Sequence, residues 1–122
     1  MILLDTNALM WLDQGHVRTR SLARAGGSRL YISPATLLEL QVLQEAGRFR
    51  VRKSLQAVLD DDRWLLDEPA AAAWFLEAVN LSWTRDPFDR PLAAHARLRR
   101  WRLATADAEL LEHLGPSYSL EL

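Results

Sequence analysis

The sequence contains no cysteine, and that absence excludes several classes of protein. Disulfide-stabilised extracellular scaffolds and zinc sites built on thiolates both require cysteine. Long apolar stretches are missing too, since none approaches the roughly 20 residues of a membrane helix. The N-terminus lacks the basic start and long apolar core of a signal peptide. We therefore expect a cytoplasmic protein with no membrane partner.

Acidic and basic residues are nearly equal in number, and lysine is almost absent. The net charge is −1, and Lys53 is the one lysine among 15 basic residues. A near-neutral balance gives no hint of passive binding to phosphate. The arginines gather in two clusters, one of Arg48, Arg50 and Arg52 with Lys53 and one of Arg97, Arg99, Arg100 and Arg102. Each cluster is either a solvated helix face or a patch that faces RNA or another partner.

Linkers, repeats and low-complexity tracts are also lacking, and the 122 residues are expected to form one domain, 1–122. Patterns typical of strands and helices alternate along it. Strands are predicted at residues 2–5, 30–32, 64–66 (as an edge strand), 103–105 and 118–122, and helices at 8–12, 17–25, 35–46, 53–59, 69–79, 88–100 and 108–114. Because the strands are separated by helices, the pattern predicts an α/β fold with a parallel sheet covered on both faces.

The first strand ends on a carboxylate, Asp5, only five residues into the chain. In open α/β sheets the ligand crevice lies outside the carboxyl ends of the strands, which is where Asp5 is expected. The strand at 103–105 is followed by Asp107 in a similar arrangement, although Asp107 also suits the N-cap of the next helix. Parallel strands would bring Asp5 and Asp107 to the same end of the sheet.

Glu39 is a third candidate, because helical spacing places it inside an apolar arc. That arc consists of Ala35, Leu38, Val42, Leu43 and Ala46. An ionised carboxylate on a buried stripe costs several kcal/mol unless a positive group compensates it. No basic residue lies one turn away, so a metal ion or a remote arginine would be required. The alternative is that Glu39 lies at the rim of the stripe and reaches solvent.

Two more acids, Asp86 and Asp89, begin the predicted helix at 88–100. Asp89 is expected to point inward, since it shares helical spacing with Leu92, Ala93 and Ala96. Asp86 suits an N-cap. Pro91 has no N–H, so helical hydrogen bonding should begin near Phe88 or Asp89.

Four segments taken together resemble, in order and spacing, the PIN-domain ribonucleases of the VapC toxin type. The segments are Asp5-Thr6-Asn7-Ala8-Leu9-Met10-Trp11, Ser33-Pro34-Ala35-Thr36-Leu37-Leu38-Glu39-Leu40, the run from Arg85 to Ala96 containing Asp86-Pro87-Phe88-Asp89-Arg90, and Thr105-Ala106-Asp107. The resemblance spans nearly the whole chain. It implies a three-layer α/β/α fold with a central, mainly parallel sheet and an acidic pocket that binds Mg²⁺ or Mn²⁺.

Residue by residue, the resemblance implies that Asp5, Glu39, Asp89 and Asp107 are the pocket acids. Asp5 and Asp89 would be direct metal ligands, and Glu39 and Asp107 are further candidates. Asp86 is a ligand, a support for one, or only a helix cap. Thr6 would orient Asp5 or a bound water through its hydroxyl group.

The chemistry of such a site follows from its donor atoms. Hard carboxylate oxygens without cysteine favour Mg²⁺ or Mn²⁺ over zinc. An ion of this kind lowers the pKa of an attacking water and neutralises charge on a scissile phosphate. We therefore predict a metal-dependent ribonuclease, the toxin component of a toxin–antitoxin pair. The alternative is a non-catalytic PIN-like scaffold that binds a protein partner or RNA. One ion or two, and which RNA, stay open.

Two protein partners are implied by the resemblance alone. One is a small antitoxin whose C-terminal segment would plug the acidic site, with an arginine paired to the carboxylates. The other is a second copy of the chain, for which Leu9, Trp11 and Leu22 are candidate contacts. The five tryptophans are either core residues or platforms for unpaired bases.

Overall fold

A five-stranded sheet with the strand order β3-β2-β1-β4-β5 forms the centre of the molecule. The structure is a computed structural model that describes residues 1–24, 27–48 and 53–122. All four pairings are parallel, which confirms the predicted parallel sheet. The strands are β1 (Ile2–Leu4), β2 (Leu30–Ile32), β3 (Leu65–Leu66), β4 (Arg102–Thr105) and β5 (Ser119–Glu121). The segment at 64–66 is an edge strand, as predicted.

The predicted helices are present, with bounds that differ by a few residues. They are α1 (Thr6–Gln14), the 3-10 helix η1 (Val17–Thr19), α2 (Arg20–Arg24), α3 (Pro34–Glu45), α4 (Leu55–Asp60), α5 (Ala71–Val79), α6 (Asp89–Arg99) and α7 (Ala108–Leu114). The end of the helix predicted at 17–25 lies outside the described residues. Lys53 precedes α4 because Ser54 is the N-cap, with its side chain accepting from the Ala57 amide.

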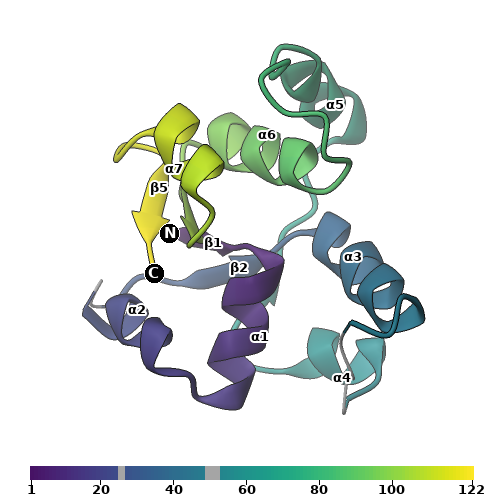
Figure 1. The fold of residues 1–122 in the computed structure, drawn as a ribbon, viewed down its shortest axis with the longest axis vertical. Helices are drawn as coiled ribbons and strands as arrows, with labels where there is room; N and C mark the ends of the chain where they lie inside the picture. Colours follow the sequence, from purple (N-terminus) through teal and green to yellow (C-terminus); the bar gives the residue numbers. More distant parts are fainter. Residues whose placement is uncertain (25–26, 49–52) are drawn as a thin grey trace.

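Two hydrophobic cores, one on each face of the sheet, make the molecule a three-layer α/β/α fold. Side chains alternate between faces along a strand, so Ile2 and Leu4 of β1 join one core and Leu3 joins the other. The first core includes residues of α1, α2 and α4, and the second includes residues of α5, α6 and α7. Figure 1 shows these two groups of helices on opposite sides of the sheet. No helix within the described ranges is long and apolar enough to cross a membrane.

Two of the three residues predicted to form a dimer contact are buried in the core. Leu9 is 3% exposed and Leu22 is 8% exposed, and both belong to the first core. The prediction was therefore wrong for these two residues, because α1 and α2 use their apolar faces to cover the sheet. Trp11 is half-buried, stacks on His16 and lies beneath the Arg18 guanidinium.

Helix α3 turns a different face to the core from the one that its periodicity suggested. Leu38 is 60% exposed and Val42 is 40% exposed, whereas Thr36 and Leu40 are buried. The predicted buried arc is wrong because leucines occur all around this helix, and spacing alone does not show which side is covered. Figure 1 shows α3 at the margin of the molecule, beyond the end of β2.

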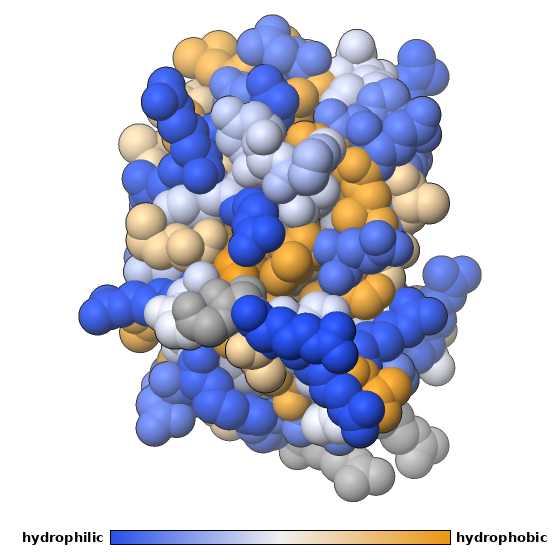
Figure 2. All heavy atoms as spheres, turned by 90° about the vertical axis from the view of Figure 1, so that its left-hand side faces the viewer, coloured by the Kyte–Doolittle hydropathy of each residue, from blue (hydrophilic) through white to orange (hydrophobic). Residues whose placement is uncertain are grey.

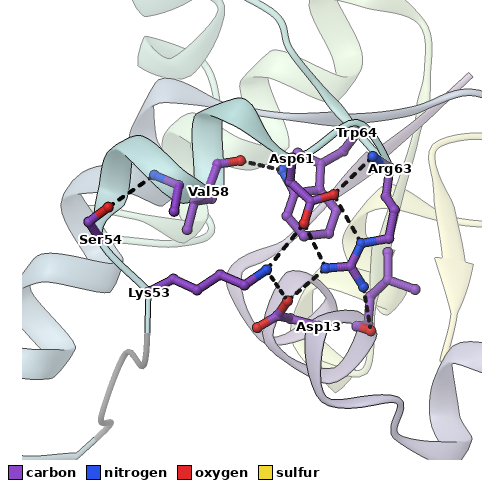
Figure 3. Close-up of polar contacts among 9 residues, drawn as sticks. Asp13, Lys53, Ser54, Val58, Asp61, Arg63 and Trp64 are labelled. Atoms are coloured by element: carbon purple, nitrogen blue, oxygen red, sulfur yellow. Dashed lines mark hydrogen bonds and ion pairs between the residues drawn. The ribbon is translucent and has the colours of Figure 1, made fainter.

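An ion-pair network joins the end of α1 to both sides of α4 (Figure 3). Lys53 Nζ lies 2.7 Å from Asp13 Oδ1 and 3.2 Å from Asp61 Oδ2, and Arg63 Nη2 lies 2.7 Å from each of these oxygens. Lys53 of the first basic cluster is thus engaged within the protein. Arg50 and Arg52 of that cluster lie outside the described residues.

The second basic cluster is also partly structural. Arg97 Nε lies 3.2 Å from Glu77 Oε1 of α5, and Arg99 Nε lies 2.8 Å from Asp67 Oδ2 beyond β3. Asp67 also lies 2.6 Å from Nε2 of the fully buried His95. Burial lowers the pKa of His95. For Arg97 and Arg99 these contacts favour a role in holding α6 in place over contact with RNA.

Arg90, in the first turn of α6, caps the end of α5. Its Nε donates to the Ala78 carbonyl at 2.8 Å, Nη2 to the Val79 carbonyl at 3.0 Å and Nη1 to the Thr84 carbonyl at 3.4 Å. A cation at a helix C-terminus satisfies carbonyls that have no partner inside the helix. Arg90 therefore ties α5 and the following loop to the start of α6.

We expect Arg90→Met to lower the free energy of unfolding by about 2 kcal/mol, the net value of hydrogen bonds to a charged group. Arg90→Lys should recover only part of this loss, because an ammonium cannot reach three carbonyls as the planar fork does. Urea unfolding followed by circular dichroism measures the difference. Surface substitutions without a structural role usually change the free energy of unfolding by less than about 0.5 kcal/mol. A loss this small for Arg90→Met would contradict the capping role.

Candidate functional site

Asp5 lies where β1 passes into α1 and is the N-cap of that helix. Its Oδ1 accepts a hydrogen bond from the Ala8 amide at 2.7 Å, and the residue is 7% exposed. Burial raises the pKa of Asp5 to about 6. Hydrogen bonds from Thr105 and Ala8 oppose that rise, and the charges of Glu39 and Asp107 add to it. The sequence predicted the place of Asp5 but not its capping role.

Glu39 reaches the site from α3 and accepts a hydrogen bond from the Thr6 hydroxyl. Thr6 was expected to orient Asp5 or a water; in the structure its hydroxyl is instead directed to Glu39. Glu39 is half-buried, and burial followed by the charge of Asp86 raises its pKa. Among the described residues, the partner of Glu39 is therefore a hydroxyl donor and not an arginine.

Asp86 and Asp89 lie at the start of α6. Asp86 Oδ1 accepts hydrogen bonds from the amides of Phe88 and Asp89, both at 2.9 Å. This cap forms the turn before the helix, and α6 begins at Asp89, as Pro91 predicted. Asp86 is therefore not the N-cap of α6, which is Phe88; it caps the turn before the helix instead, because the helix begins two residues later than an N-cap at Asp86 requires. A role of Asp86 as a ligand stays a prediction.

The Asp89 carboxylate is the most strongly perturbed acid of the site. Burial raises its pKa to about 7, and the charges of Asp86, Asp107, Glu39 and Asp5 contribute in that order. Within residues 1–24, 27–48 and 53–122 this carboxylate forms neither a hydrogen bond nor an ion pair. It is a half-buried acid surrounded by other acids, and that environment favours a bound cation.

Asp107 follows β4 and caps α7, with Oδ1 accepting from the Leu110 amide at 2.9 Å. The side chain is more exposed than the other pocket acids. Its amide donates to the Thr105 hydroxyl at 3.1 Å. The nearby Thr105 side chain also opposes the rise in the pKa of Asp5. Sequence reasoning missed Thr105, although a hydroxyl residue at the end of a buried strand was a signal.

The register of the sheet explains why these acids meet. Leu4 is paired with Ala104 in the parallel ladder, so Asp5 and Asp107 emerge at the same edge. Helices α3 and α6 then bring Glu39, Asp86 and Asp89 to that edge, and each of these acids lies within electrostatic range of others in the group. The structure thus brings together all the acids that the sequence nominated.

The donor set fits a hydrated divalent ion. Among the described residues, no group of three His, Asp or Glu side chains is arranged to hold a metal ion directly. Mg²⁺ usually keeps several waters and binds through one or two carboxylates, so a larger cage is not required. Suitable hard oxygens come from the Asp89 carboxylate, which has no polar partner in the described part of the chain, and from Asp5, which uses Oδ1 in capping.

The tryptophans divide into two groups. Trp64 and Trp74 are core residues, with exposures of 2% and 7%, so they cannot stack on bases. Trp11, Trp83 and Trp101 are half-buried and stack on His16, His113 and Tyr31, respectively.

The chain is similar in fold to several solved toxin–antitoxin proteins. One chain of VapBC2 from Rickettsia felis, in a structure with a promoter DNA fragment, is 18% identical, with a TM-score of 0.70 and coverage of 99% of this chain and 98% of that chain. A toxin–antitoxin complex from Klebsiella pneumoniae gives 19% identity, a TM-score of 0.69 and coverage of 98% and 96%. DNA-bound VapBC from Salmonella typhimurium gives 22% identity, a TM-score of 0.66 and coverage of 98% of this chain and 96% of that chain.

At these identities the structural likeness demonstrates a shared fold. Comparison with curated protein sequences gives no significant match. The model of the PIN domain family, in contrast, matches residues 2–114, nearly the whole length of the chain. The chain therefore belongs to the PIN domain family.

Proposed function

We propose that this protein is a metal-dependent ribonuclease that acts as the toxin of a toxin–antitoxin pair. The observation that carries the proposal is the environment of Asp89, a half-buried carboxylate that lies among four other acids and has a pKa raised to about 7. Family membership and the likeness to chains from toxin–antitoxin complexes support the same function.

In this proposal Asp5 and Asp89 hold Mg²⁺ or Mn²⁺, and Glu39 and Asp107 complete the acidic pocket. A bound ion supplies an activated water and charge neutralisation at the scissile phosphate. The protein holds Asp5 rigid through the Ala8 amide, which leaves its second oxygen for a ligand. Thr6 fixes the Glu39 carboxylate, which then lies ready to accept a proton from a water or to orient it.

The charge of the pocket explains why a cation is needed before RNA can approach. Several carboxylates face the same space, and a phosphodiester brings another negative charge. Repulsion between like charges at short range costs several kcal/mol in a partly desolvated site. A divalent ion reverses the sign of this interaction, so metal binding and substrate binding should be coupled.

An antitoxin is the proposed protein partner. Similar chains occur in complexes described as VapBC, and an acidic pocket suits an arginine from such a partner. A hollow of about 440 Å³ between α1, η1, α2 and the start of β2 offers apolar Leu12, Val17 and Leu30 beside Arg20. On the side of the molecule where α2 lies, apolar side chains reach the surface between charged ones (Figure 2).

A homodimer is the second proposed assembly. Its proposed contact residues differ from Leu9, Trp11 and Leu22, the candidates from the sequence. Exposed apolar side chains concentrate on α3 and α5; they are Leu38, Val42, Phe75, Leu76 and Val79, each at least 40% exposed. Both helices lie on the right-hand side in Figure 1. Large apolar surface of this kind is typical of protein interfaces.

The ribonuclease proposal is tested with Asp5→Asn, which keeps an oxygen for the Ala8 amide but removes the charge. We expect cleavage of single-stranded RNA to fall at least about 100-fold and Mn²⁺ binding by calorimetry to disappear, since metal ligands require an anionic oxygen. Asp60→Asn, at an exposed acid on α4, is the matched control and should behave as wild type. Wild-type protein without metal-dependent cleavage but with a bound partner would instead favour the scaffold.

Stability should depend on pH through Asp89. Its pKa in the folded protein is raised to about 7, so between pH 4 and 7 folding retains a proton that the unfolded chain loses, and stability falls as pH rises through this window. In EDTA we expect Asp89→Asn to be more stable than wild type at pH 8 by about 1–2 kcal/mol, a figure reduced for partial solvent exposure. The difference should shrink by pH 5. If Asp89→Asn and wild type had the same urea midpoint at pH 8 and also at pH 5, this pH dependence would be contradicted.

The dimer is tested with Leu76→Lys, at a residue that is 68% exposed and contributes little to the core. We expect wild type to run as a dimer in analytical ultracentrifugation and Leu76→Lys to shift to monomer at the same concentration, because a buried lysine lacks a partner. Gln56→Lys, at an exposed position of α4, is the control. A wild-type protein that is still monomeric at about 100 µM, a concentration on the order of the Kd of a weak transient contact, would argue against this dimer.

A further inference from the structure

Four exposed arginines lie between the end of α1 and the start of β2. They are Arg18, Arg20, Arg24 and Arg29, and the stretch from Gln14 to Leu38 that contains them has no acidic residue. Within the described residues, none of their guanidinium groups forms a hydrogen bond or an ion pair. The protein therefore leaves their positive charge without a compensating acid.

The register of the sheet places this group at the edge where the strands begin. Ile2, the first residue of β1, is paired with Leu30 on one side and with Arg102 on the other. The Ile2 amide also donates to the Arg29 carbonyl at 2.9 Å. Arg29 and Arg102 thus flank the start of β1, and Arg20 lines the same hollow as Leu30.

The charges of the molecule are consequently divided between the two edges of the sheet. Asp5 and Asp107 follow the ends of β1 and β4, and Glu121, which is paired with Thr105, lies at that same edge. The arginines lie at the opposite edge. Figure 2, which views the side of the molecule where α2 lies, shows strongly hydrophilic side chains projecting beside apolar ones.

These arginines differ from those that act within the protein. Arg63 pairs with acids of α1 and α4, Arg90 caps α5, and Arg97 and Arg99 hold α6 in place. A chain with a net charge of −1 and an acidic pocket repels RNA over much of its surface. Attraction for a polyanionic substrate must then come from a basic surface away from the pocket.

We propose that the surface formed by Arg18, Arg20, Arg24 and Arg29, the basic edge, binds the phosphate backbone of single-stranded RNA. The inference rests on the proposed function, because the RNA is the substrate of the acidic pocket. A guanidinium group presents a planar fork that matches the oxygens of a phosphate. Neutralising several successive phosphates is the main source of affinity for nucleic acids without regard to sequence.

Aromatic rings at this surface favour RNA over an acidic protein segment. The Arg18 guanidinium lies over the Trp11 ring at 5.0 Å, and Trp11 stacks on the exposed His16. Surfaces that bind single strands combine positive charge along the backbone with aromatic side chains on which bases stack. An acidic protein segment would use only the charge.

One RNA strand is long enough to contact both edges. The central strands have three and four residues, and at about 3.3 Å per residue the two edges are about 10 Å apart. Single-strand-binding surfaces engage about 4–16 nucleotides. A strand of that length can be held at the basic edge while another of its phosphates lies at the acidic pocket.

The experiment measures RNA binding with the pocket emptied of metal. Arg20→Gln, Arg24→Gln and Arg29→Gln are combined in one variant, and Arg18 is kept because of its contact with Trp11. The same three positions changed to lysine give the matched control, which alters the same side chains but keeps their charge. Binding of fluorescently labelled poly(U) is followed by anisotropy in EDTA over a series of KCl concentrations, because without metal the acidic pocket contributes only repulsion.

We expect the glutamine variant to bind poly(U) at least about tenfold more weakly at low salt. The slope of log affinity against log salt should fall in magnitude by about 2, since each neutralised phosphate of a single strand contributes about 0.7. The lysine variant should keep the slope of wild type. A glutamine variant with the affinity and slope of wild type would overturn the inference, and so would poly-L-glutamate that displaces poly(U) at an equal concentration of charge.

Cleavage of the same RNA in Mn²⁺ separates this inference from the proposed function. Wild type that binds poly(U) with the expected salt dependence but cleaves no RNA would support the basic edge and overturn the ribonuclease. A glutamine variant that cleaves RNA with the KM of wild type would overturn the basic edge and leave the ribonuclease intact.

Discussion

Burial of like charges at one edge of the sheet is the constraint on which the site depends. A parallel sheet directs the carboxyl ends of its central strands to the same side, and here β1 and β4 deliver Asp5 and Asp107 there. Helices α3 and α6 add Glu39 and Asp89. Burial and mutual repulsion raise the pKa of Asp5 and Asp89 to about 6 and 7, so the folded state holds a cluster that a cation would relieve.

The acids are tolerated because several of them also stabilise local structure. Asp5, Asp86 and Asp107 each accept main-chain amide hydrogen bonds that begin a helix or form the turn before it. Negative side chains at helix N-termini are favourable, and this gain offsets part of the repulsion among them. The same residues therefore contribute to the fold and to the pocket, with one oxygen used for capping and the other left for a ligand.

Several arginines hold the helices around the site in place. Arg90 caps α5, while Arg97 and Arg99 tie α6 to α5 and to the segment after β3. Helix α6 carries Asp89, so these contacts hold that acid at the sheet edge. Arginine-rich sequence is often interpreted as a nucleic-acid surface, but here at least three of the arginines act within the protein.

The sequence by itself determined the alternation of strands and helices, the parallel sheet and the acids at strand and helix ends, because these follow from local hydrophobic patterns, caps and the motif spacing around Asp5 and Asp89. Only the tertiary structure decided which face of α3 is buried, that the Thr6 hydroxyl donates to Glu39 and that the acids from α3 and α6 reach the end of β1. Those features depend on contacts between segments distant in the chain, and periodicity within one helix or strand carries no information about its neighbours.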